Sequence, residues 1–466
     1  MNKEIKDLED LRKKYYFRTK GGYVYKSDKG ISEHVIREIS KVKNEPKWML
    51  DIRLKALKLF YELEMPDWAP KFNIDFDNLF LYLKPVDKTE SDWNEVPEEI
   101  RETFDRLGIP EAERQFLAGA GAQYESEMIY QKVKESLARK GVIFMSMDDA
   151  VKEHPDLVKK YFSKLIPASD NKFAALNTAA WSGGTFIYIP KGVKVDLPLQ
   201  TYFRMNFEST GQFERSLIIV DEDAYVHYIE GCTAPLYSKA NLHAGVVEVF
   251  VHKNGKMRYS TIQNWSKNVL NLTTKRGLAE ENAVIEWVDG NLGSGVNMKY
   301  PAIILKGDNS RGDILGISIA GKGQNIDAGA KIIALGKNVR GKIVSKGISF
   351  DKGIHTYRGL VFVDEKADNA LVDVSCDALI LDEVSVSNTY PKNKIKNKNC
   401  VVKHEASVGK LDEELLFYMM SRGIKEEEAK AMLVLGFLSP VAKELPMEYA
   451  IEFNKLLKMQ FENAIG

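Results

Sequence analysis

The pattern of hydrophobic and polar positions changes character twice along the chain. Over the first 140 or so residues, apolar positions recur at helical spacing, as in Trp48–Tyr61 and again in Glu111–Lys140. A further helix is expected over Ser32–Ile39, with the Ser32 side chain as its N-cap. We therefore predict a mainly helical N-terminal domain over residues 1–140, interrupted near Gly119 and Gly121.

From about Gly183 to Val402 the pattern is one of short strands, rich in β-branched and aromatic residues. In the later half, small polar clusters such as Gly336-Lys337-Asn338 separate these strands at intervals of 13 to 17 residues. Near-regular turns without long helices between them are typical of a solenoid of stacked strands. A β-sandwich is the alternative, but its turns would lie about 8–12 residues apart. The pattern favours a right-handed parallel β-helix over residues 141–404.

The pattern becomes helical again after Gly409. Leu411, Leu415, Tyr418 and Met419 fall on one helical face, and Gly423 is placed to end that helix. Further helices are expected over about Lys425–Leu435 and after Pro446. The predicted protein is thus mainly β, with a β-helix core flanked by an N-terminal helical domain and a C-terminal helical domain over residues 405–466.

Composition and charge limit the cellular location and the classes of partner that we expect. Lys+Arg and Asp+Glu are equal at 66 each, which argues against a dominant surface for nucleic acid or anionic membranes. The N-terminus has no apolar signal core, and the apolar stretch Ala431–Ala442 is too short to span a bilayer. Three cysteines do not make a disulfide framework. We therefore expect a cytoplasmic protein with no nucleic-acid and no membrane partner.

Familiar catalytic and metal-binding motifs are missing from the sequence. It contains no Walker loop, no His-Glu-x-x-His, no paired Cys-x-x-Cys and no nucleophile elbow. The chemistry that remains is Cys376 followed 28 residues later by His404-Glu405, about two turn intervals of the predicted solenoid. Cys376 and His404 are then expected on adjacent rungs, roughly 5 Å apart. A thiolate with nitrogen and oxygen donors suits iron, although a chance grouping is the alternative.

A second set of candidates lies earlier in the β region. Cys232, in Glu230–Pro235, could receive sulfur as a persulfide or could fill the core. Nearby strand-like runs carry polar residues and a tryptophan that could line the solenoid interior, whereas the polar ones could equally face solvent. These residues are Arg204, Asn206, Gln263, Trp265 and Lys275. Cys400 lies in a loop-like stretch and is not expected to take part.

Along nearly its whole length the sequence resembles the SufB family of iron–sulfur cluster assembly scaffolds. The matching strings lie in all three regions and in the family's order. They include Asn44-Glu45-Pro46-Lys47-Trp48-Met49-Leu50, Gly121-Ala122-Gln123-Tyr124-Glu125-Ser126-Glu127, Gly211-Gln212-Phe213-Glu214-Arg215, Glu230 to Pro235, and Thr356-Tyr357-Arg358-Gly359-Leu360-Val361.

This resemblance implies a scaffold rather than an enzyme, which builds a transient iron–sulfur cluster and passes it to acceptors. It implies that Cys376, His404 and Glu405 bind the cluster and that Cys232 accepts sulfur from a donor protein. The route between the two cysteines would pass Arg204, Asn206, Gln263, Trp265 and Lys275. One thiolate, one imidazole and one carboxylate are too few for a four-iron cluster, so we expect half a site, completed across a dimer interface.

The resemblance also implies partners. The C-terminal helical domain would dock a SufC-type ATPase, and the β-helix would pair with the SufD paralogue or with a second copy of this chain; flavin binding is left open. A dense apolar group near the C-terminus either forms the ATPase interface or packs on the end of the β-helix. Its members are Met432, Leu433, Leu435, Phe437 and Leu438.

The sequence departs from the family pattern at three places. Lys403 stands where many relatives carry an acid, so it is not a carboxylate ligand here. The stretch Trp265–Thr273 is shortened, and Leu278 lies near a position where many relatives carry a cysteine. Two other functions stay open: a SufD-like structural partner, against which Cys376 argues, and a β-helix carbohydrate enzyme, which would need a facing pair of carboxylates.

Overall fold

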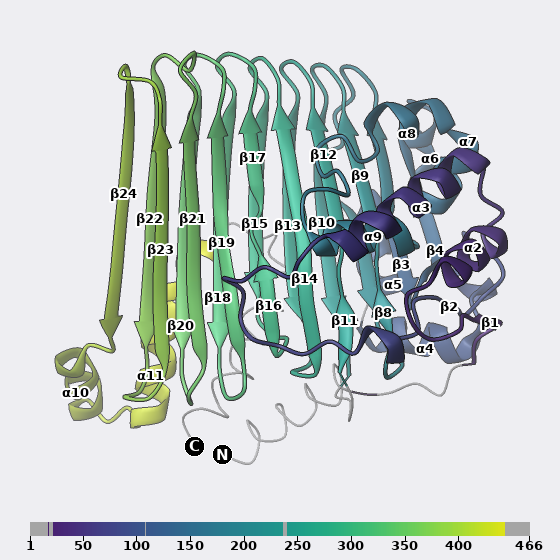
Figure 1. Cartoon of the computed structure of the whole chain (residues 1–466). Helices are drawn as coiled ribbons and strands as arrows, with labels where there is room; N and C mark the ends of the chain where they lie inside the picture. The colour runs from purple at the N-terminus through teal and green to yellow at the C-terminus, as the bar shows by residue number, and fades with distance from the viewer. Residues whose placement is uncertain (1–16, 18–21, 108, 236–239, 443–466) are drawn as a thin grey trace.

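The computed structural model describes residues 17, 22–107, 109–235 and 240–442, and its core is a parallel β-solenoid of about eight turns (Figure 1). Two sheets face each other across the solenoid interior, and the chain passes from one to the other at each half-turn. The ten-stranded sheet has the order β24 (Cys400–Lys410), β22 (Ala370–Ile380), β20 (Arg340–Ser349), β18 (Arg311–Ala320), β15 (Val284–Asn291), β13 (Lys256–Asn264), β10 (Tyr225–Thr233), β7 (Leu199–Arg204), β3 (Gly119–Tyr124) and β4 (Glu127–Val133).

The second sheet has twelve strands. Its main path is β23 (Val386–Ile395), β21 (Ile354–Val363), β19 (Asn325–Ala334), β16 (Val296–Lys299), β14 (Val269–Ala279), β12 (Val246–Val251), β9 (Arg215–Val220), β6 (Thr185–Ile189) and β5 (Ile143–Ser146), joined by β17 (Ala302–Leu305), β11 (Asn241–His243) and β8 (Gly211–Gln212). Neighbours in both sheets are parallel, apart from the antiparallel pairs β3–β4 and β5–β6. The prediction of a parallel β-helix is confirmed, and the β-sandwich alternative is wrong.

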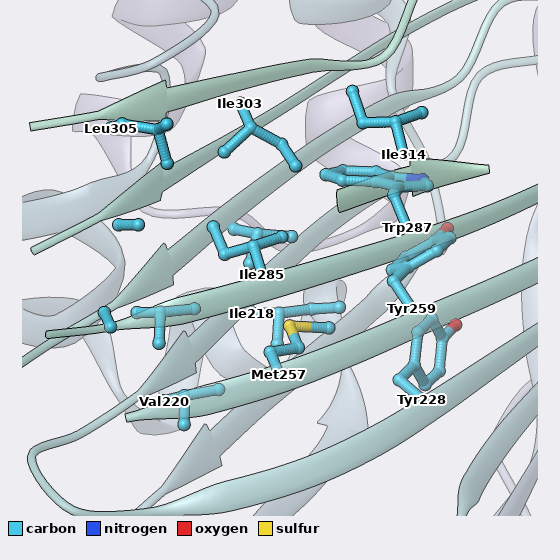
Figure 2. Packing of buried hydrophobic residues seen from close by; sticks show 14 of the residues in the cluster. Ile218, Val220, Tyr228, Met257, Tyr259, Ile285, Trp287, Ile303, Leu305 and Ile314 are labelled. Atoms are coloured by element: carbon cyan, nitrogen blue, oxygen red, sulfur yellow. The ribbon is translucent and has the colours of Figure 1, made fainter. Parts of the chain in front are cut away.

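One turn of the solenoid takes about thirty residues, and the register is in step from turn to turn. Arg311 pairs with Arg340, and Ala370 pairs with Cys400. Parallel pairing in step places inward-facing side chains above one another, so the interior consists of columns that run along the solenoid axis. In the column of Figure 2, Tyr228, Tyr259 and Trp287 follow one another on β10, β13 and β15, with ring centroids 5.3 and 4.9 Å apart.

A second column lies at one edge of the solenoid, where successive turns each place an asparagine or an aspartate at the same position. These residues adopt positive φ angles, a conformation that Asn and Asp tolerate better than other non-glycine residues. Their side chains also bond along the column, as from Asn282 to Asn254 (3.0 Å) and from Asn254 to Asp223 (2.9 Å). The positions are Asp223, Asn254, Asn282, Asn309, Asn338 and Asn369. Polar turn clusters at this edge, such as the one that contains Asn338, therefore stack in one column.

Helices from the N-terminal half cover the outer faces of the first turns (Figure 1). They are α2 (Glu33–Val42), α3 (Lys47–Glu62), α4 (Glu98–Leu107), α5 (Ile109–Phe116), α6 (Glu135–Ala138), α7 (Met147–Glu153), α8 (Pro155–Tyr161) and α9 (Lys172–Ala180), with the short pair β1 (Tyr25–Lys26) and β2 (Leu83–Lys84) and 3₁₀ turns at Phe76–Asn78 and Trp93–Glu95. Ser32 caps α2 as predicted, accepting from the Val35 N–H.

The helical prediction for Glu111–Lys140 is wrong over most of its length. Only its two ends are helical, and β3 and β4 lie between them as part of the ten-stranded sheet. The two glycines explain the difference: a Cβ at Gly119 would lie 2.7 Å from the Lys132 carbonyl oxygen. A close approach of two backbones needs glycine, so here it marks a tight strand pair rather than a break in a helix. Sheet and helix therefore interleave across the residue 140 boundary that the sequence suggested.

The C-terminal region begins after β24, which extends to Lys410. Helix α10 (Glu413–Ser421) ends as predicted near Gly423, whose φ is +86°. Helix α11 (Glu426–Ala442) packs Val434 and Leu438 against the outer face of the ten-stranded sheet. The helix predicted after Pro446 lies outside the described residues. Within the described ranges, no helix has both the length and the apolar character needed to cross a membrane.

The buried ion pair between Glu248 and Arg215 anchors the segment between α8 and α9 to the solenoid. Its removal is therefore expected to lower the stability of the protein. Glu248 bonds Arg215 (2.7 Å) and the N–H groups of Ser163, Leu165 and Ile166 (2.8, 2.8 and 3.0 Å). Glu248→Ala leaves the Arg215 charge buried without its counter-charge, so we expect the free energy of unfolding in urea to fall by about 3–5 kcal/mol. Lys253→Ala, at an exposed pair with Glu281, should cause no measurable change. Equal losses in both variants would contradict the assignment.

Candidate functional site

Cys376 lies near the last turn of the solenoid and faces its interior. It belongs to β22, where alternate residues from Ala370 to Ala378 are buried, and it is 4% exposed. Its neighbour in β20 is Ser345 and its neighbour in β24 is Ala406. Only the terminal strand β24 lies between Cys376 and the open end of the ten-stranded sheet.

His404 and Glu405 lie on that terminal strand, but they face opposite sides. In the β22–β24 register, His404 pairs with Val374 and Glu405 pairs with Ser375. Because successive residues of a strand alternate between faces, His404 shares the inner face with Cys376, one column away. The Glu405 side chain is exposed on the outer face, and only its backbone carbonyl is near the thiol, with Cys376 Sγ at 3.4 Å. The structure brings Cys376 and His404 to one surface and leaves the Glu405 carboxylate on the other.

The two inward-facing groups are in their neutral forms near pH 7. Burial, and to a lesser extent Asp377, raises the pKa of Cys376 from 9.0 to about 11. Burial also lowers the pKa of His404. A neutral imidazole has a lone pair for a metal, whereas the thiol must lose its proton first. Nδ1 of His404 lies 3.3 Å from Asn393 Oδ1, a contact that spans the mouth of the solenoid from one sheet to the other.

The interior around Cys376 contains polar atoms that no described residue satisfies. These are Nε2 of His404, Nε2 of His355 and the hydroxyl of Tyr357, the last two on β21. Buried polar atoms in proteins are nearly always hydrogen-bonded, so three such atoms near one thiol indicate a place prepared for a polar occupant. His355 and Tyr357 were not singled out from the sequence, because only the register shows that they face inward near Cys376.

Cys232 lies deeper in the solenoid, at a buried cluster of charges centred on Glu230. One Glu230 oxygen lies 3.8 Å from Cys232 Sγ and 2.9 Å from Lys275 Nζ, and Tyr259 donates to the other at 2.5 Å. Burial alone would raise the pKa of Glu230, but Lys275 and Tyr259 outweigh it and lower that pKa to about 2. Burial and the Glu230 carboxylate raise the pKa of Cys232 well above its usual value. Glu230 is thus the hub of this site.

The five residues expected to line a route to Cys376 lie mostly around Cys232. Gln263 is its register neighbour, Trp265 packs in the same apolar cluster, and Lys275 reaches it through Glu230. Arg204 donates to Thr233 Oγ1 (2.9 Å), the residue after Cys232. Asn206 is buried just beyond β7, where its N–H donates to Glu125. Five strand steps separate Cys232 from Cys376, roughly 24 Å at the usual strand spacing, so these five residues lie near Cys232 and do not reach Cys376.

The strand register shows which residues lie between the two cysteines. Cys376 stands in one column with Glu230, which continues as Thr261, Asp289, Gly316 and Ser345. The adjacent column runs from Cys232 through Gln263, Asn291, Ser318 and Gly347 to Ala378. Midway, Lys299 pairs with Asp289 at 2.7 Å, and a cavity of about 10 Å³, large enough for about one water, lies against Asp289, Asn291 and Ser345. Polar or small side chains therefore connect the two cysteines.

The apolar group near the C-terminus divides into buried and exposed residues. Val434 and Leu438 are buried against the ten-stranded sheet, and Leu435 and Phe437 pack on the same cluster. Leu433 is partly buried and Met432 is half exposed. The exposed apolar side chains lie instead mainly on α10, where Phe417 is 73% exposed and Leu415, Tyr418 and Met420 accompany it. Packing on the β-helix thus accounts for most of the predicted docking residues.

Comparison with known proteins agrees with this architecture. The family described as SUF system FeS cluster assembly, SufBD core domain, matches residues 203–437, and the SufBD protein N-terminal region matches residues 122–201. The chain belongs to the SufBD family. The iron–sulfur cluster assembly protein SufB of Bacillus subtilis is 54% identical over the full length of both chains. SufBD family proteins of Staphylococcus epidermidis and Staphylococcus haemolyticus are also 54% identical, again over both full lengths.

The raised pKa of Cys376 predicts that its thiol reacts slowly with alkylating reagents in the folded protein. At pH 8 a pKa of about 11 in place of 9.0 reduces the thiolate fraction about a hundredfold. We expect iodoacetamide to alkylate Cys376 of the folded protein at least that much more slowly than the same cysteine in guanidinium. The folded-state rate should rise about tenfold per pH unit up to pH 10. Peptide mass spectrometry measures both rates, and equal rates at pH 8 would show that the thiol is not protected.

Proposed function

We propose that this chain is a scaffold of the SUF system in the cytoplasm, which accepts sulfur and iron and holds a nascent iron–sulfur cluster at the open end of its solenoid. The observation that carries the proposal is that Cys376 and His404 share the inner face of the last two strands of one sheet, in adjacent columns. Thiolate and imidazole are ligands that iron accepts, and a site at the rim suits a cluster that must leave again. The family and the full-length similarity to a cluster assembly protein support the same function.

We infer that a second chain completes the site. Among the described residues, strands β23 and β24 are the free edges of the two sheets, and an unpaired edge readily pairs with another strand. Apolar side chains are exposed on both, including Tyr390 and Ile395 on β23 and Val401 and Val408 on β24. Pairing at these edges would set the rim of one solenoid against that of its partner, a SufD-type paralogue or a second copy. The outward Glu405 would then be a ligand near the joint.

We also infer that sulfur enters at Cys232. The thiol is buried beside Glu230 and Lys275, at the start of the two polar columns that end at Cys376. A sulfur donor protein would pass the outer sulfur of its own cysteine persulfide to Cys232, which becomes a persulfide while the donor's cysteine leaves as a thiolate. The two columns would then connect this point with the rim. The function is therefore divided between two places, entry within the solenoid and assembly at its end.

Removal of the Cys376 thiol tests the scaffold proposal. After anaerobic incubation with ferrous iron and sulfide, we expect Cys376→Ser to lose the visible iron–sulfur absorption of the wild type. His404→Ala should retain part of it, because the Cys376 thiolate, the donor that iron–sulfur clusters use most, remains, and Glu405→Ala should have the smallest effect. Cys400→Ser is the matched control, since Cys400 is the first residue of β24, the strand that carries His404 and Glu405. Unchanged iron and sulfide content in Cys376→Ser would refute the site.

We further propose that a SufC-type ATPase docks on α10. The exposed Leu415, Phe417, Tyr418 and Met420 form an apolar surface at the C-terminal end of the described chain, and such a surface marks an interaction site. Met432, the most exposed member of the apolar group on α11, would extend it. Leu438 is buried and would act only by holding α11 on the sheet.

Substitution by a charged residue distinguishes side chains that bind the ATPase from those that pack on the solenoid. We expect Phe417→Asp to weaken co-purification with the ATPase at least tenfold while leaving the thermal midpoint unchanged, because Phe417 is 73% exposed. Leu438→Asp should instead lower the thermal midpoint, since it places a charge in a buried cluster. Leu371→Asp, at an exposed apolar residue of β22, serves as the control and should bind the ATPase normally. Normal binding by Phe417→Asp would place the ATPase elsewhere.

A further inference from the structure

The hydroxyl of Tyr357 has no role in the function proposed so far, and its position is unusual. Tyr357 lies on β21, is 1% exposed, and belongs to the same buried cluster as Cys376. A Cβ placed at Gly347 would meet the His355 ring at 2.1 Å, so these two residues oppose each other across the interior. The facing strands run in opposite directions, which sets Tyr357 opposite Ser345, the register neighbour of Cys376.

The Tyr357 ring leans along its own strand toward Gly359. A Cβ at Gly359 would lie 2.9 Å from the Cε1 and hydroxyl atoms of Tyr357, so the ring covers this glycine. By the same facing register, Gly359 lies opposite the column of Ile343, Val374 and His404. The hydroxyl is therefore directed into the space between the columns of Cys376 and His404.

This hydroxyl has no hydrogen-bond partner within the described ranges. Three other buried or largely buried tyrosines differ: Tyr228 donates to Thr185 (3.1 Å), Tyr259 to Glu230 (2.5 Å) and Tyr300 to Asp327 (2.8 Å). A buried hydroxyl without a partner costs free energy that phenylalanine in the same place would avoid. This unbonded O–H, in the same buried cluster as the Cys376 thiol, thus calls for an acceptor that arrives from outside the chain.

We propose that Tyr357 is a positioning residue whose hydroxyl donates a hydrogen bond to the sulfur carried by Cys376, as a persulfide or as a sulfide of the nascent cluster. This inference rests on the proposed function of Cys376. No covalent bond is made or broken by Tyr357. A hydrogen bond to an anionic sulfur stabilises its charge in the apolar interior and so slows the loss of iron from the site.

Tyr357→Phe removes the one oxygen atom and preserves the ring. The wild type and the variant are loaded anaerobically with ferrous iron and sulfide, and release of iron to a chelator is followed by visible absorption. We expect the variant to release iron about fivefold faster, the effect of one ordinary hydrogen bond, and its sulfur-to-iron absorption bands to shift. Its thermal midpoint without iron should equal or exceed that of the wild type, because the unsatisfied hydroxyl is gone.

Tyr300→Phe is the matched control, since it removes a hydroxyl that already has its acceptor. It should lower the thermal midpoint and leave iron release and absorption unchanged. If Tyr357→Phe releases iron at the wild-type rate with unshifted bands, the inference about Tyr357 is wrong. Loading of Cys376→Ser to the wild-type level would instead overturn the proposed function itself, so the two failures are distinguishable.

Discussion

Parallel pairing in step, repeated about every thirty residues, is the constraint on which the rest of this structure depends. Each strand of the solenoid satisfies its backbone with the strand before and the strand after, so the stack needs no other support until it ends. At the N-terminal side the chain closes the stack with antiparallel strands and a layer of helices. At the other side β23 and β24 have no further strand among the described residues. That end is where Cys376 and His404 lie, because stacking leaves only the last rungs accessible.

The same register divides the interior into columns of different chemistry. One column carries Tyr228, Tyr259 and Trp287 and holds the sheets together through large apolar contacts. Beside it, Glu230, Asp289 and Ser345 lead to Cys376 through a region that an ordinary core would fill with aliphatic side chains. Buried charges are costly unless paired, and here the carboxylates are paired with Lys275 and Lys299. A polar column maintained at that cost is consistent with a role in function rather than in stability.

Burial also decides the protonation of the two cysteines. Both thiols have raised pKa values, Cys232 beside the Glu230 carboxylate and Cys376 in the apolar cluster near the rim. Neutral thiols are poor nucleophiles and resist oxidation, so burial lowers the reactivity of both cysteines. His404, whose pKa is lowered, is ready to bind metal without losing a proton. The rim therefore combines one donor that is already available with one that a metal must deprotonate.

The sequence by itself determined the class of the fold, the solenoid over most of its length, and the residue types of the site. The local features that predicted these elements are the turn spacing, the β-branched runs and the caps at Ser32 and Gly423. Such features predict local structure correctly because their interactions span only a few residues. Cys376 and His404 are two turn intervals apart in the sequence, which likewise predicted that they lie on adjacent strands. This works because the spacing of turns in the sequence gives the length of one solenoid turn.

Only the tertiary structure decided which face each residue occupies. A shift of one residue in register exchanges inside for outside, and the sequence could not show that Glu405 faces away from Cys376 while Tyr357 faces toward it. Gly119 illustrates the same limit. In the sequence, a glycine that interrupts a helix looks the same as one that allows close strand pairing, and only the position of the Lys132 backbone distinguishes the two. The sequence left open whether Leu438 forms an interface or packs on the β-helix. The structure buries it against the ten-stranded sheet, whose strands are distant in sequence. Contacts between distant segments set these outcomes, and no local pattern encodes them.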